Sequence, residues 1–179
     1  MKKLRVVMLL SLLCTPIMAQ APNAVAVEQM KKMSFLVGQW KGEGWVQYGP
    51  GQRVTVAATE TVQSRLGGEV LLIEGLGRNK DNVSGKVEVN GHDAIALMFY
   101  DVKTGTFRFQ AHRAGGTSID TELKVTPGGF EWGFQDERAG TLRFTMKLTD
   151  KGEWFEIGEM SRDGKTWYKF VETKLERMK

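Results

Sequence analysis

The chain has 179 residues, of which 41% are hydrophobic, and it carries 25 Lys and Arg against 21 Asp and Glu. Lys2, Lys3 and Arg5 supply three of the basic residues, so the rest of the chain is almost neutral. No dense basic stripe remains, which argues against nucleic acid as a partner. The length suits a single domain with one core.

The first 19 residues have the plan of a bacterial secretory signal peptide. The three basic residues precede an apolar run from Val6 to Leu13, and small residues follow it. This run is shorter than the roughly 20 residues of a membrane-spanning helix, and no comparable run recurs. We therefore expect no integral membrane segment, cleavage after Ala19 or alternatively after Ala21, and export to the periplasm or the medium.

Cys14 is the only cysteine, and cleavage would remove it. The exported chain would then have no disulfide and no thiol chemistry. Lipid attachment at Cys14 is the alternative, but Leu12 and Leu13 stand where such anchors need small residues.

Residues 20–34 are expected to form an N-terminal segment with a short helix. Val27, Met30 and Met33 recur at three-residue spacing, which indicates one or two helical turns before the first strand. These turns are expected to act as a plug or lid. The remainder, residues 35–179, is the predicted β-barrel domain.

After Gly38 the apolar pattern changes to period two, and turn signals recur along the chain. Nine such signals lie at residues 48–52, 66–69, 79–92, 103–105, 114–116, 127–129, 138–140, 150–152 and 162–165. They predict about ten antiparallel strands and no crossover helix. Closure into an up-and-down barrel removes the open edges of such a meander. The fold class is therefore all-β, and a ten-strand barrel has room for a cavity.

The first predicted strand, within "FLVGQWKGEGWVQY", contains an unusual number of glycines. Glycine costs roughly 0.5 to 1 kcal/mol relative to alanine inside an element. Trp40, Gly42 and Gly44 share one face, where the absence of side chains suits a strand that coils against its neighbours. Gly38 precedes this face. We expect Trp40 to close the barrel floor.

These residues resemble the calycin superfamily. "GQW" is similar to the lipocalin Gly-x-Trp signature, and "FLVGQWKGEG" resembles the first strand of nitrobindin-type haem barrels and of a large, uncharacterised group of exported bacterial lipocalin-like proteins. The resemblance to that bacterial group continues through Glu60–Gly77 to the C-terminal "DGKTWYKFVETKLER". It implies a ten-strand barrel. Nitrobindins bind haem through a late histidine, but no histidine follows His112, so no haem site carries over.

Strand alternation predicts three inward charges. Glu60 shares parity with Val56 and Val62, and Arg113 shares parity with Phe107 and Phe109. Glu74 is placed on the same face as Val70, Leu72 and Leu76. Buried charges persist only when paired or hydrogen-bonded, so we expect one cluster of Glu60, Glu74 and Arg113. Its role is either structural pairing or the anchoring of a polar ligand group.

Aromatic residues would supply the apolar part of a cavity, although packing alone also explains most of them. The candidate ligand contacts of this kind are Phe99, Phe109, Trp132 and Phe144. His92 and His112 are isolated, without the close ligand spacing of a zinc site, so neither a metal nor another cofactor is predicted. No G-x-S-x-G motif is present, and no catalytic residue is assigned.

Three functional hypotheses follow. The first is an exported barrel that binds a small, largely apolar ligand with a polar end. The second is an enzyme that uses Glu60 or Glu74 as a general base or acid after burial raises its pKa. The third is a barrel with a filled interior that acts in envelope assembly or protein contacts. The sequence identifies neither the ligand nor the oligomeric state.

Overall fold

The computed structural model describes residues 20–80 and 91–179. It contains ten strands, as the turn signals predict, and the first nineteen residues and most of the predicted 79–92 turn lie outside the described part. The strands are β1 (Gly38–Gly49), β2 (Gln52–Arg65), β3 (Val70–Lys80), β4 (His92–Asp101), β5 (Thr106–Arg113), β6 (Thr117–Thr126), β7 (Gly129–Asp136), β8 (Gly140–Leu148), β9 (Trp154–Ser161) and β10 (Tyr168–Arg177).

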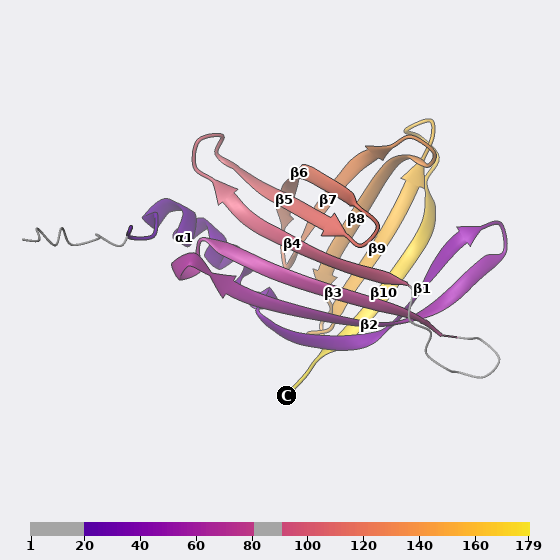
Figure 1. Cartoon of the computed structure of the whole chain (residues 1–179), viewed down its shortest axis with the longest axis horizontal. Coiled ribbons are helices and arrows are strands. Elements are labelled where there is room, and N and C mark those ends of the chain that lie inside the picture. Colours follow the sequence, from indigo (N-terminus) through magenta and orange to yellow (C-terminus); the bar gives the residue numbers. More distant parts are fainter. Residues whose placement is uncertain (1–19, 81–90) are drawn as a thin grey trace, which may run out of the picture.

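The strands form one closed antiparallel barrel (Figure 1). Each strand pairs with the next in sequence, and β1 pairs with β10 from Trp40–Arg177 to Val46–Val171. Closure gives each strand a hydrogen-bonded neighbour on both sides, so no strand is left as an edge. The all-β, up-and-down architecture expected from the sequence is confirmed.

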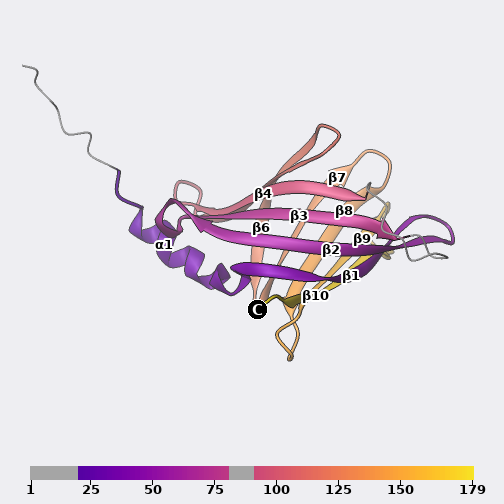
Figure 2. The ribbon, with the colours of Figure 1, turned by 60° about the horizontal axis from the view of Figure 1, so that its bottom comes forward.

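A short helical segment closes one end of the barrel. It consists of α1 (Ala24–Met30), which Asn23 caps by accepting from the Val25 and Ala26 amides, followed by the 3₁₀ helix η1 (Lys31–Leu36). Met33 and Leu36 are fully buried in the core. Figure 2 shows this segment at the end of the strands opposite the β1–β2 turn. The expected plug is confirmed, and we call its end the floor and the opposite end the open end.

Trp40 lies at the floor and is fully buried. Its indole nitrogen donates to the Leu36 carbonyl at 2.8 Å, and its ring meets the edge of Trp154 with centroids 5.7 Å apart. The hydrogen bond satisfies the one polar group of a side chain that is otherwise apolar. Trp40 thus packs at the floor, as expected, and also joins the helical segment to the strands.

The glycines of β1 allow β10 to approach closely. A Cβ on Gly42 would overlap the Lys174 carbonyl oxygen, and one on Gly44 would overlap the Glu172 carbonyl oxygen. Both obstacles are backbone atoms, which cannot move aside as a flexible side chain can. The glycines are therefore required where the barrel closes.

None of the helices in residues 20–80 and 91–179 is both long and apolar enough to cross a membrane.

Candidate functional site

The barrel interior is packed at the floor and accessible to solvent toward the open end. Inward-facing side chains near the floor are fully buried, among them Met98, Met146 and Leu175. Farther along the strands, inward-facing Phe134 and Phe144 are only partly buried. Because these rings point into the barrel, their exposed surface faces the interior. The upper half of the interior is the candidate binding site.

Aromatic rings line one side of this interior. Trp132 of β7 stacks on Phe144 of β8 with centroids 4.1 Å apart and planes 9° apart, and Phe109 of β5 lies 4.7 Å from Trp132. Phe134 extends the stack, and Phe170 meets the edge of Phe144 at 5.7 Å. We call these five residues the aromatic wall. It contains Phe109, Trp132 and Phe144, three of the four aromatic candidates from the sequence.

Glu60 projects from β2 into the same interior, as β2 alternation predicts. Its carboxylate lies over Gly75 of β3, where a Cβ would stand 2.8 Å from both oxygens. Burial, and then the charge of Glu156, raise the pKa of Glu60 to about 8. Since the side chain keeps some accessible surface, that surface must face the interior.

Glu156 of β9 is the second inward carboxylate. It accepts a hydrogen bond from the Trp154 indole nitrogen at 3.0 Å. Burial raises the pKa of Glu156, and the Trp154 hydrogen bond partly opposes that rise. We did not expect Glu156 from the sequence, although it shares parity with Trp154 and Gly158, both of which are buried. The two glutamates form what we call the carboxylate pair.

Glu74 faces outward, so its predicted inward orientation is wrong. In β3 the inner face carries Leu71, Ile73 and Gly75, whereas Glu74 is exposed. Both faces of β3 are rich in leucine or isoleucine, and glycines occupy two inward positions. A count of apolar residues therefore wrongly assigns the outward-facing residues of β3 to the barrel interior.

Phe99 is also on the outer face, contrary to expectation. It pairs with Val70 and Arg108, whereas its neighbours Met98 and Tyr100 face inward. The outer face of β4 is itself apolar, with Ile95 and Leu97 50% and 41% exposed. A strand that is apolar on both faces does not reveal its inner side by composition.

Arg113 has the expected inward parity but does not join Glu60. It is exposed at the open end, where its guanidinium donates to the Gly91 carbonyl at 3.4 Å. Strands β3 and β4 separate it from Glu60. Its positive charge adds to burial in lowering the pKa of His92. The predicted three-residue cluster is therefore wrong.

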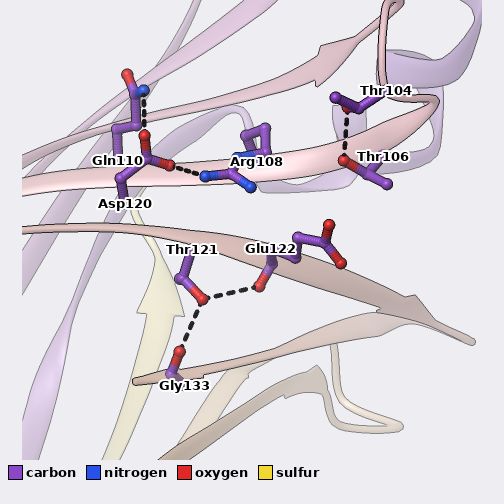
Figure 3. Close-up of polar contacts among 8 residues, drawn as sticks. All are labelled: Thr104, Thr106, Arg108, Gln110, Asp120, Thr121, Glu122 and Gly133. Atoms are coloured by element: carbon purple, nitrogen blue, oxygen red, sulfur yellow. Dashed lines mark hydrogen bonds and ion pairs between the residues drawn. The ribbon is translucent and has the colours of Figure 1, made fainter. Parts of the chain in front are cut away.

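The ladder between β6 and β7 is the shortest in the barrel. Their ladder runs only from Thr126–Gly129 to Leu123–Trp132, after which the Thr121 hydroxyl donates to the Gly133 carbonyl at 2.7 Å (Figure 3). A cavity of about 330 Å³ lies here. Its lining residues are Glu122, Leu123, Lys124, Glu131, Trp132, Gly133, Thr141, Arg143 and Trp167. Most of these residues face outward, and Trp132 of the aromatic wall is also part of the lining.

Outside the barrel, polar contacts join β5 to β6. Asp120 accepts from both Arg108 and Gln110, and Figure 3 shows the three side chains together. The hydrogen bond from Arg108 is the largest cause of the lowered pKa of Asp120. His112, which is also on the outer face of β5, is exposed. Within the described ranges, no three His, Asp or Glu side chains gather so as to hold a metal ion.

No family model matches the chain, and no curated protein matches it. Among solved structures, the chain is similar to the one described as "Crystal Structure of Rv2717c from M. tuberculosis". The similarity has a TM-score of 0.57 at 14% identity and covers 84% of this chain and 97% of that chain. It shows the fold alone, and the fold of this chain is a ten-strand antiparallel barrel.

Proposed function

We propose that the protein is an exported, lipocalin-like barrel that binds a small, largely apolar ligand with a polar end. The observation that carries this proposal is the aromatic wall. All five rings face inward. Phe109 is buried, and the other four stay partly exposed. Exposed inward rings favour an apolar guest, because burial of apolar surface is worth roughly 25 cal/mol per Å².

The binding experiment uses a fluorescent apolar probe and two tryptophan variants. Trp132→Ala removes the centre of the aromatic wall, and we expect it to weaken probe binding at least tenfold. Trp45→Ala is the matched control, because Trp45 lies on the opposite face of β1 from Trp40, where the Arg53 guanidinium covers its ring at 3.5 Å. Equal affinities for both variants, or no probe binding by the wild type, would overturn the proposal.

Native mass spectrometry of protein purified from its own host complements the probe. A retained small molecule is the expected result, and its mass identifies the ligand. A barrel that retains no small molecule and also binds no apolar probe would instead favour a role in protein contacts.

The proposal of export is supported by the N-terminal sequence alone, since residues 1–19 lie outside the part of the chain that the structure describes. N-terminal sequencing of exported material should begin at Gln20 after cleavage behind Ala19, or at Pro22 after cleavage behind Ala21. Material that begins at Met1, or that carries lipid on Cys14, would contradict this part of the proposal.

Glu60 favours a second candidate function, proton-transfer catalysis. A carboxyl group with a pKa of about 8 is poised to accept or donate a proton near neutral pH. Conversion of the bound ligand by the wild type, lost in Glu60→Gln with binding retained, would establish an enzyme. Unchanged ligand after prolonged incubation would exclude that activity.

A further inference from the structure

The inner face of the barrel holds the carboxylate pair without a neighbouring cation among the residues that the structure describes. Both carboxyls adjoin the contact between Trp40 and Trp154, whose ring centroids lie 5.7 Å apart, because Glu60 is the register partner of Trp40 and Glu156 accepts from the Trp154 indole. The charge of Glu156 raises the pKa of Glu60, and no cation contributes to the pKa of either group. Arg177 is engaged at the floor, where it stacks 4.1 Å from the Trp40 ring and donates to the Phe35 and Val37 carbonyls. The pair therefore has no protein counter-ion within the described residues.

The carboxylate pair also has unused hydrogen-bonding capacity. Glu156 accepts from Trp154 Nε1, and no side chain or amide in the described ranges donates to Glu60. A carboxylate accepts several hydrogen bonds and donates none when ionised. A ligand that supplies positive charge or several donors complements this pair, whereas an anionic ligand is repelled.

The pair adjoins the aromatic wall. In β9, Gly158 is the next inward residue after Glu156, and its absent side chain leaves room for Phe144, whose ring carbon would stand 2.8 Å from a Cβ there. An elongated ligand can therefore place its polar end at the carboxylates and its apolar part along Phe144 and Trp132. Aromatic faces also attract cations.

We propose that the polar end of the ligand is a cationic nitrogen, held between Glu60 and Glu156, and that the ligand is a hydrophobic amine or alkylammonium compound. The inference rests on the proposed binding function and specifies its ligand class. It departs from the sequence-based expectation that a cluster of Glu60, Glu74 and Arg113 anchors the polar group, because Glu74 faces outward and Arg113 lies at the open end beside His92.

Three probes of equal chain length test the ligand class: dodecyltrimethylammonium, dodecanol and dodecanoate, each below its micellar concentration. Calorimetric titration of the full chain at pH 8.5 should give at least tenfold tighter binding of the ammonium than of dodecanol, with dodecanoate the weakest. Equal affinities would overturn the cation proposal and leave apolar binding intact. Failure of all three to bind would overturn the proposed function itself.

The pH dependence supplies an independent readout. The quaternary ammonium is charged at every pH, so its affinity follows the protein. Between pH 6 and 8 the affinity should rise by up to about tenfold per pH unit, because binding displaces the proton of Glu60, whose pKa is about 8. Around Glu60, the inward groups that could alter this slope are Glu156 on β9, Arg177 on β10 and, at the open end, His92 and Arg113; β1 and β3 present Trp40 and glycines.

Glu60→Gln separates a ligand contact from a merely structural carboxyl. We expect it to weaken ammonium binding at least tenfold at pH 8.5, to reduce the pH dependence, and to leave dodecanol binding unchanged, which also reports that the barrel is folded. Glu74→Gln, an identical change on the outer face of β3, is the matched control and should match the wild type. Wild-type ammonium affinity in Glu60→Gln would overturn the proposal.

Discussion

Trp40 connects three elements through one side chain. Its indole nitrogen holds the Leu36 carbonyl at the end of η1, its ring packs against Trp154 of β9, and the Arg177 guanidinium of β10 lies on its face. Full burial leaves no room for water to replace the lost contacts. The stability of the floor therefore depends on this residue more than on its neighbours.

We expect Trp40→Ala to lower the free energy of unfolding by about 3 to 5 kcal/mol, as for other large core aromatics. Trp45→Ala, on the outward face of the same strand, should cost about 1 kcal/mol or less. Urea denaturation of both variants measures the difference. Similar losses for the two would contradict the assignment of Trp40 to the floor.

Glu60 makes stability depend on pH in an unusual direction. Its pKa rises from 4.5 to about 8 on folding, so between these values the folded chain holds a proton that the unfolded chain has lost. Stability therefore decreases as pH rises through this window, by up to about 1.4 kcal/mol per pH unit. Ordinary paired carboxyls show the opposite slope.

Glu60→Gln removes the titrating group, so this variant should lose part of that slope, with Glu156 supplying the remainder. We expect it to be more stable than the wild type at pH 8, with the difference shrinking toward pH 5. Denaturation midpoints at the two pH values test this. Equal destabilisation at both would show that Glu60 is held by a partner in its ionised form.

At the scale of elements, the contact between β1 and β10 depends on two positions without side chains. Gly42→Ala would push a Cβ into the Lys174 carbonyl, and we expect a loss of about 1 to 3 kcal/mol, the usual range for overpacking. Gly49→Ala is the control, because its Cβ would meet only the Gln52 side chain, at an ordinary 3.5 Å or more. Thermal unfolding of both variants measures the difference. A Gly42→Ala variant as stable as Gly49→Ala would show that β1 and β10 can move apart at no cost in stability.

The elements differ in how well sequence predicts them. In β2 the inward Val56, Ala58 and Val62 alternate with mostly polar residues, so its orientation and that of Glu60 are correctly predicted. In β3 apolar residues lie on both faces, and parity alone misplaces Glu74. The inward orientation of Glu156 is not predicted, because bulky apolar residues are the signal for an inner face. On the inner face of β9, one residue is charged (Glu156) and one has no side chain (Gly158). Turn signals in the sequence predict the number of strands well. They do not predict which strands face each other across the barrel interior, because that depends on how the barrel closes.

At the scale of the molecule, the two ends of the barrel have different roles. The floor half holds the core, and the upper half holds partly exposed aromatic rings. This division separates the residues that stabilise the fold from the aromatic rings available to a ligand. The carboxylate pair lies at the boundary, because Glu60 is in register with Trp40 and Glu156 accepts from Trp154.

Two alanine variants should therefore show opposite profiles. Met33→Ala, in the helical segment, should lower unfolding free energy by about 2 to 5 kcal/mol and leave the affinity for an apolar probe unchanged. Phe144→Ala should weaken binding of the probe at least tenfold, and it should lower the free energy of unfolding by less than Met33→Ala does. Paired denaturation and probe titrations measure both. A weakening of probe binding in Met33→Ala equal to that in Phe144→Ala would show that the floor also contacts the ligand.

The ladder between β1 and β10 also has a kinetic consequence. It joins Trp40 to Arg177, residues near opposite ends of the described chain, whereas the other ladders join consecutive strands. Consecutive hairpins can form early from local contacts, but loop-closure entropy opposes the last ladder until most of the chain is ordered. A growing chain that has not yet released β10 leaves the edge of β1 that faces β10 unpaired, while β2 pairs with its other edge. The barrel therefore closes only after synthesis of this strand, and closure is expected to be the slow step of folding.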